Sequence, residues 1–388
     1  MDAGVLDRGG MILSRLSARF FRNFSECQLG FSSGTNWILG GNGHGKTNLL
    51  EAIHVLALSR SFRTHQSSDL IQWESGQSYL GGEVRSRDSD TWLSIEQKAL
   101  SRRYCVNRSR VDLLEYVGRL SAVVFSTAQV EQFKSGDASR RRLLDRGLYP
   151  LQPTHLKRVL DYGRVIRQKN SLLREGPSGY NNQSRDLLDS WNLQIAVLGA
   201  RIIQSRHGYI EKIRSKLLLR NNRFTPENLT LHYVASSEVD AGASLVQIEE
   251  QLTAMLNSER ESEFRARRAL IGPHRDRISM DVDGRCMQRF GSAGQQRSSL
   301  IAYQLAQMEV HFDLRGEYPL FLMDDLDAEL DEARIDRLLQ VLGARAQLFI
   351  TTNKPDFIRG RSVEFTAGRG SKVFHVESGR FAETATVH

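Results

Sequence analysis

The stretch GGNGHGKTNLLEAI, residues 40–53, places a glycine-rich turn directly before a lysine and an apolar pattern with helical spacing. Gly40, four residues and then Gly45-Lys46-Thr47 match the P-loop pattern. Glycines let successive backbone N–H groups turn around an anionic phosphate, and the positive end of the following helix dipole adds to the attraction. The stretch therefore predicts a triphosphate site between a strand and a helix.

The side chains of this loop have separate expected tasks. Lys46 would carry positive charge to the β- and γ-phosphates of ATP, and the Thr47 hydroxyl would ligate Mg²⁺. The residues predicted to contact the nucleotide from this loop are Gly40, Asn42, Gly43, Gly45, Lys46, Thr47 and Asn48. An ordinary glycine turn is the alternative, and the flanking strand and helix patterns disfavour it.

A second segment supplies acidic partners for a metal ion. PLFLMDDLDAELD, residues 319–331, is an apolar run that leads into two adjacent aspartates. We predict that Asp324 holds Mg²⁺ through water and that Asp325 orients or deprotonates the attacking water. These acids could instead cap the following helix, but two neighbouring carboxylates on a buried strand are costly without a cation.

A third segment, FGSAGQQRSSLIAYQLAQ at residues 290–307, predicts another anion-binding helix start at Ser292, Gly294 and Gln295. One chain rarely needs two helix ends on one γ-phosphate, so the second is expected to serve a neighbouring chain's nucleotide. The alternative is an ordinary capped helix.

The pattern along the chain predicts an α/β protein with a helical insertion. The first third mixes strands and helices, and residues from 135 to about 220 are helical and basic. The mixed pattern returns from residue 269, with buried strands after helices, as in a parallel sheet. Within the insertion, a helix of about 35 residues and roughly 50 Å is expected, and the turn-rich loop 174–185 predicts that two long helices fold back on each other. One face of this helix is expected to contain Leu187, Leu188, Trp191, Ile195, Leu198 and Ile202.

Composition limits the classes of protein to consider. The formal net charge is +8, which favours a polyanionic partner. Cys27, Cys105 and Cys286 form no CxxC pair, so neither a disulfide framework nor a zinc site is predicted. The chain has no apolar run of the roughly 20 residues that span a bilayer. We expect a protein of the reducing cytoplasm that does not enter a membrane.

With these three motifs in this order, the sequence resembles the ABC-type ATPases of chromosome maintenance, and among them the RecF family of bacterial recombination mediators. Besides the P-loop and acidic segments, the resemblance rests on VVFSTAQVEQFKSGDASRRRLLD, LDYGRVIRQKNSLL, IGPHRDRI and GSAGQQRSSL. It implies an ABC-type ATPase head, a mixed sheet with flanking helices, interrupted by a helical lobe. Lobe I would comprise residues 11–134 and 266–388, lobe II residues 135–265, and residues 1–10 would be an extension.

The resemblance also implies residue roles. Lys46 and Thr47 match the Walker A residues, Asp324 the metal-coordinating aspartate of Walker B, and Asp325 the catalytic carboxylate. The remaining matches are the signature at Ser292, Gly294 and Gln295, the D-loop at residues 329–331, the switch at Thr352 or Asn353, and Gln129 as a candidate Q-loop residue. The family places two heads face to face, so that each P-loop and the partner's signature share one ATP.

The function implied by the resemblance is an ATP-dependent dimer that binds double-stranded, gapped or junction DNA. With RecO and RecR it would promote loading of RecA, with weak, DNA-stimulated ATP hydrolysis. The basic stretch 140–174 is the expected DNA contact. Two alternatives stay open: a nucleotide-gated DNA scaffold and, disfavoured by charge, a transporter ATPase subunit. A long-armed protein of the SMC or Rad50 type is rejected on length, because too few residues separate Thr47 from Ser292 and no zinc-hook cysteines lie between them.

Overall fold

A computed structural model describes residues 9–87, 89–175, 182–224, 228–236, 239–326, 331–358 and 370–384. The chain divides into two compact units. The first, here called the head unit, contains Met1–Glu131, Leu219–Glu227 and Ser292–His388, and the second, the helical unit, contains Gln132–Leu218 and Asn228–Gly291. The sequence division had assigned residues 266–291 to lobe I, whereas the structure packs them in the helical unit.

A six-stranded, mostly parallel sheet forms the centre of the head unit, in the order β15-β14-β3-β13-β12-β8. Its strands are β3 (Thr35–Leu39), β8 (Ala122–Phe125), β12 (Leu320–Met323), β13 (Leu348–Thr352), β14 (Ser371–Glu377) and β15 (Arg380–Thr384). Only the β14–β15 pair is antiparallel. Every residue of β3, β12 and β13 is buried, as expected for parallel strands covered on both faces.

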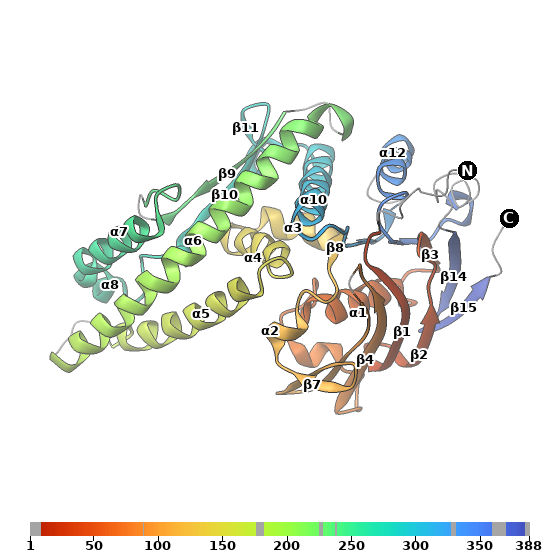
Figure 1. Ribbon diagram of the computed structural model, residues 1–388, viewed down its shortest axis with the longest axis horizontal. Coiled ribbons are helices and arrows are strands. Elements are labelled where there is room, and N and C mark those ends of the chain that lie inside the picture. Colours follow the sequence, from red (N-terminus) through yellow and green to blue (C-terminus); the bar gives the residue numbers. More distant parts are fainter. Residues whose placement is uncertain are drawn as a thin grey trace. The chain divides into compact units, whose positions relative to one another are not determined.

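An antiparallel sheet of six strands, in the order β2-β1-β4-β5-β6-β7, completes the head unit. It contains β1 (Ile12–Phe21), β2 (Phe24–Gly30), β4 (Gln77–Arg85), β5 (Asp90–Lys98), β6 (Arg102–Val106) and β7 (Ser109–Val111). Helix α1 (Lys46–Leu58) contacts strands of both sheets and is buried along nearly its whole length (Figure 1). The other helices are α2 (Leu113–Tyr116), α3 (Thr127–Lys134), which continues into the helical unit, α10 (Ala293–Arg315) and α12 (Glu332–Leu342).

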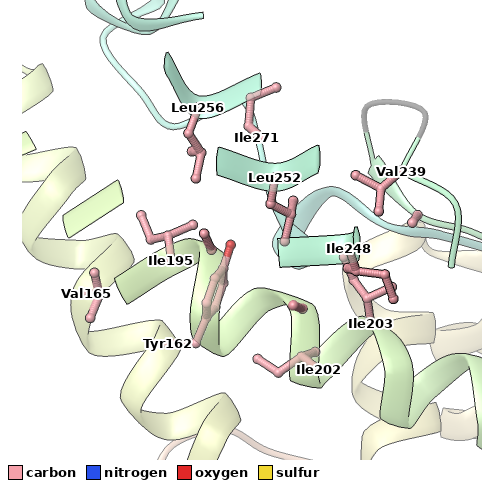
Figure 2. Packing of buried hydrophobic residues seen from close by; sticks show 13 residues of the cluster. Tyr162, Val165, Ile195, Ile202, Ile203, Val239, Ile248, Leu252, Leu256 and Ile271 are labelled. Atoms are coloured by element: carbon pink, nitrogen blue, oxygen red, sulfur yellow. The ribbon is translucent and has the colours of Figure 1, made fainter. Parts of the chain in front are cut away.

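The helical unit combines helices with a small sheet. Its helices are α4 (Asp137–Leu148), α5 (Pro153–Leu173), most of α6 (Asn182–Phe224), α7 (Leu245–Ser258), α8 (Arg260–Ala266) and α9 (Met287–Phe290). The sheet has the order β11-β10-β9, with β9 (Leu229–Val234), β10 (Arg277–Val282) and β11 (Arg285–Cys286). Figure 2 shows the core, where Tyr162 of α5 and Ile195 of α6 meet Leu252 of α7.

The structure confirms the expected long helix and corrects its length and its apolar face. Helix α6 has 43 residues, longer than the 35 expected, and Gly208 does not interrupt it. At 1.5 Å per residue its length is about 65 Å. Leu188, Ile195 and Ile202 of the predicted face are buried, but Leu187 is exposed, so including it in that face was wrong.

Two expectations from composition can be compared with the structure. The three cysteines are all free thiols. In the part of the chain that the structure describes, no helix combines the length and the apolar character needed to cross a membrane.

Candidate nucleotide-binding site

The P-loop lies between β3 and α1 at the centre of the parallel sheet, and its glycines are required by backbone geometry. Gly43 and Gly45 have φ values of 81° and 114°, which side chains of L residues rarely allow. A Cβ on Gly40 would lie 2.5 Å from the Val376 carbonyl oxygen, and one on Gly45 would lie 2.9 Å from the Asn23 amide nitrogen. The loop is thus packed closely against β14 and the β1–β2 turn.

Lys46 is held inside this loop. Its side chain is 5% exposed, and Nζ donates to the carbonyl oxygens of Gly40 at 2.9 Å and Gly41 at 3.1 Å. Nζ also lies 3.9 Å from Oδ1 of Asp325. The ammonium group is therefore fixed in the loop that would surround the phosphates, beside the acidic segment that the sequence had assigned to the same site.

Asp324 and Thr47, the two predicted metal ligands, are in direct contact. Thr47 Oγ1 donates to Asp324 Oδ1 at 3.0 Å, and Thr351 Oγ1 donates to the same oxygen at 2.9 Å. Burial, together with the negative charge of the neighbouring Asp325, raises the pKa of the Asp324 carboxyl from 3.8 to about 6. A buried carboxylate stabilised mainly by hydroxyl groups is suited to a hard cation, and Mg²⁺ is usually bound by one or two such groups plus phosphate oxygens.

Asp325 has an unusual backbone and a more accessible side chain. Its φ is 47°, in the left-handed region, where a residue without glycine's freedom carries strain. The Asp325 N–H donates to Thr351 Oγ1 at 2.7 Å, and the carboxylate is 47% exposed. This geometry leaves the Asp325 carboxylate accessible to solvent while Asp324 is buried.

The sequence reasoning missed Thr351, whose hydroxyl connects the two aspartates. It had assigned the switch position to Thr352 or Asn353. Thr352 is buried, its hydroxyl accepts from the Lys354 N–H at 3.1 Å, and its carbonyl accepts from the Gly40 N–H at 3.4 Å. Successive strand residues point to opposite faces, so the alternation along β13 was the signal that could have distinguished the two threonines.

Arg63 was also missed, and Asn48 has a structural role that the motif did not show. Asn48 Oδ1 accepts from Arg63 Nη1 at 2.8 Å, and Asn48 Nδ2 donates to Asn23 Oδ1 at 2.7 Å. The positive charge of Arg63 opposes the rise in the pKa of Asp324. These contacts fix Asn48 between two neighbouring segments. No local sequence pattern indicates them, because they depend on tertiary packing.

The signature residues form a complete helix cap at the start of α10. Ser292 Oγ accepts from the Gln295 N–H at 3.2 Å, and Gln295 Oε1 accepts from the Ser292 N–H at 3.0 Å. This reciprocal pair is a capping box. Gly294 has open space where a Cβ would lie. Ser292 is exposed, so it can cap α10 and still be accessible to a second chain.

The two remaining expectations concern residues outside the phosphate loop. Gln129 is buried, and its Oε1 accepts from Gln304 Nε2 at 2.7 Å, which ties α3 to α10. Of the expected D-loop, residues 329 and 330 lie outside the described residues. Asp331 caps α12 by accepting from the Arg334 N–H at 2.9 Å.

Comparisons with known proteins agree with this arrangement. Residues 12–368 match the family described as RecF/RecN/SMC N terminal domain. The chain is 32% identical over 380 residues to the DNA replication and repair protein RecF of an Exiguobacterium species, covering 97% of this chain and all of that protein. The solved structure of the recombination mediator protein RecF-ATP in the RecFOR pathway has a TM-score of 0.85 at 28% identity, covering 97% of this chain and 99% of that one. An Smc head bound to a domain of ScpA, with a TM-score of 0.52 at 14% identity over 97% of this chain and 98% of that one, shares the fold alone.

Proposed function

Because the chain belongs to the RecF family, within the larger RecF, RecN and SMC group, we propose that it is an ATP-dependent, DNA-binding recombination mediator. The family has the ATPase head fold of RecF and SMC proteins, and its solved relatives include one with ATP. The single observation that carries the proposal is the contact between Thr47 and Asp324 beside Lys46, because it joins two segments that lie 277 positions apart in the sequence.

Each residue of the site has a task in hydrolysis. The Lys46 ammonium stabilises negative charge on the β- and γ-phosphates, and the loop N–H groups orient them. Thr47 and Asp324 hold Mg²⁺, which when bound neutralises charge that develops on the phosphate oxygens. Asp325 orients the attacking water and accepts its proton. The left-handed backbone at Asp325 supports this task because it directs the carboxylate to the accessible side of the site.

We infer that ATP joins two copies of the chain. Ser292, Gly294 and Gln295 begin a helix of 23 residues, whose amino end carries partial positive charge. Ser292 is exposed and the other two residues are half-buried, which supports a contact with the γ-phosphate held by a partner subunit. Binding of ATP would then favour the dimer and hydrolysis would release it, since the nucleotide contacts both copies only in the paired state.

DNA is the proposed polyanionic partner, and the structure narrows the basic stretch that would contact it. Lys169 is buried against Glu263, at 2.6 Å, and Arg146 is buried too, so neither is available to DNA. The exposed cations of this stretch are Arg142, Lys157, Arg164, Arg167 and Arg174. In the cytoplasm such a dimer would bind double-stranded, gapped or junction DNA and act with RecO and RecR to load RecA. The RecFOR pathway named for the solved relative supports RecO and RecR as partners.

The test is the oligomeric state and DNA affinity with ATP, with ADP and without nucleotide. We expect dimers and tight binding of gapped duplex only with ATP. Lys46→Arg should retain ATP-dependent dimers but lose hydrolysis, whereas Lys98→Arg, in an exposed position, should behave like the wild type. Equal DNA binding without nucleotide, or dimers unaffected by ATP, would refute the proposal. Single-turnover hydrolysis with and without gapped DNA would separate a DNA-stimulated ATPase from a nucleotide-gated scaffold.

A further inference from the structure

The helical unit contains a pocket of about 420 Å³ whose charged walls are arginines. Arg268, Arg275 and Arg277 line it together with Ser236, and Val234 and Leu270 supply apolar wall. None of the described residues that line the pocket is acidic. Its volume is within the range of small-ligand sites.

Two of these arginines, Arg275 and Arg277, flank a buried aspartate. The Asp276 side chain is fully buried, where it accepts from Arg206 Nη1 at 2.8 Å and from the Ser236 N–H at 3.0 Å. Arg275 ends a short 3-10 helix, Pro273–Arg275, and Arg277 begins β10, so the two arginines flank the buried Asp276. Both line the pocket, whereas Asp276 does not.

The guanidinium groups of the pocket are not neutralised by carboxylates. Arg275 Nη2 donates to the Ala269 carbonyl at 3.0 Å, and its Nε is buried without an acceptor among the described residues. Arg268 and Arg277 are exposed and have no ion pair within the described part of the chain. A buried guanidinium N–H without an acceptor costs free energy unless a ligand completes it.

Arg275 and Arg277 belong to a segment that does not contribute to the nucleotide site. IGPHRDRI, residues 271–278, carries part of the resemblance to RecF proteins, yet it packs in the helical unit. The buried Asp276 accounts for one charged residue of this segment. Within the described part of the chain, neither Arg275 nor Arg277 forms a buried ion pair like that of Asp276 with Arg206.

We propose that this pocket is a second anion site, which binds a backbone phosphodiester of DNA. The inference rests on the proposed DNA-binding function. Arginine suits this ligand because its planar fork donates two parallel hydrogen bonds to phosphate oxygens. Val234 and Leu270 offer apolar contact to the sugar, and the exposed Arg268 and Arg277 attract the strand at the rim.

The test compares two double variants of the full chain with equal loss of charge. Arg268→Gln/Arg277→Gln removes the rim of the pocket, and Lys212→Gln/Arg285→Gln removes two exposed cations of the helical unit that do not line it. Arg275 is left in place because it also holds the Ala269 carbonyl. Affinity for duplex and gapped DNA is measured with ATP between 50 and 200 mM salt, and thermal melting verifies folding.

We expect the pocket variant to lose roughly tenfold or more in affinity, and the slope of log K against log salt to fall by about one, as for one lost phosphate contact. The control variant should change less than threefold. Equal behaviour of the two variants, with a wild type that binds DNA, would overturn the inference and leave the proposed function intact. A wild type without DNA binding would overturn both.

A melting series with pyrophosphate, run with saturating Mg·ATP so that the P-loop is occupied, distinguishes DNA from a free phosphate compound. If pyrophosphate stabilises the wild type but not the pocket variant, while both variants bind DNA alike, the pocket takes a small phosphate ligand and the nucleic-acid assignment is overturned. If DNA competes with pyrophosphate for the pocket, the assignment is supported.

Discussion

One buried cluster in each unit contains carboxylates, and these two clusters compensate the negative charge differently. In the helical unit, Arg206 lies between Asp145 and Asp276, with nitrogen–oxygen distances of 2.8 Å to each. In the head unit, Asp324 receives hydrogen bonds from the hydroxyls of Thr47 and Thr351. One cluster contains its own cation, and the other is stabilised mainly by neutral donors.

The pKa values of Asp145 and Asp324 follow this difference, whereas burial raises the pKa of Asp276 although Arg206 contacts it. Burial alone would raise the pKa of Asp145, but the charge of Arg206 and the hydrogen bond with His155 outweigh burial and hold that pKa well below its usual range. Burial and the neighbouring Asp325 raise the pKa of Asp324 to about 6, and among the described residues no cation forms an ion pair with its carboxylate as Arg206 does with Asp145. A buried charge with an internal partner stabilises a fold, whereas one without a partner marks a place for a ligand.

The largest expected effect is on the compensated cluster. Arg206→Met should lower the free energy of unfolding by about 3–5 kcal/mol, because it leaves two buried carboxylates without their cation. Arg214→Met breaks a half-exposed pair with Glu211 and should cost about 0–1 kcal/mol. Urea unfolding at pH 7.5 measures both. A loss below 1 kcal/mol for Arg206→Met would contradict the assigned role, and Asp145→Asn added to it should restore part of the stability.

A substitution of Asp324 is expected to raise the free energy of unfolding, whereas Arg206→Met lowers it. A carboxyl whose pKa is higher in the folded than in the unfolded state favours folding at pH values below the unfolded pKa, and that contribution is lost as pH rises through about 6. The shift from 3.8 to about 6 corresponds to about 3 kcal/mol at pH 7.5. Asp324→Asn should therefore stabilise the nucleotide-free protein by up to about 3 kcal/mol at pH 7.5 without Mg²⁺.

At pH 4 the same substitution should have little effect on stability, because the Asp324 carboxyl of the folded wild type is then protonated and as uncharged as the asparagine. The substitution should also abolish ATP hydrolysis. Thermal melting across this pH range without and with Mg²⁺ tests the prediction. A stability difference between Asp324→Asn and the wild type that did not change with pH would show that the Asp324 carboxylate is already compensated in the folded protein.

What could be predicted from the sequence differs between the two clusters for a physical reason. The P-loop and the aspartates of the head unit follow local rules, since a tight phosphate turn needs glycines at fixed spacing and a buried strand precedes its acids. The helical unit's boundary depends on β9 pairing with β10, more than forty residues later in the chain. No local pattern indicates that pairing, so residues 266–291 were assigned to the other lobe.

Thr351 differs from this case, because alternation along β13 could have distinguished it from Thr352, and it provides the next prediction. Thr351→Val removes the hydroxyl that joins Asp324 to the Asp325 N–H, which should cost about 1–3 kcal/mol of stability and lower the hydrolysis rate about tenfold. Thr352→Val, at the position chosen from sequence, should leave hydrolysis within about threefold of the wild type. Steady-state ATPase assays compare the two. A larger loss of hydrolysis in Thr352→Val than in Thr351→Val would support the switch role predicted for Thr352.

Two substitutions of Ser292, which have the smallest expected effects on stability, distinguish its role as a helix cap from its proposed contact with a second chain. Ser292→Ala removes the cap of α10 and should cost about 1 kcal/mol, while Ser292→Asp keeps an acceptor for the Gln295 N–H and should change stability by less than about 0.5 kcal/mol. The aspartate would, however, place negative charge against a γ-phosphate bound by the partner subunit. We therefore expect Ser292→Asp to fold normally, bind ATP and fail to form the ATP-dependent dimer, as measured by sedimentation. Dimers of normal affinity in Ser292→Asp would restrict this residue to the cap and remove the head unit's proposed contact with a second chain.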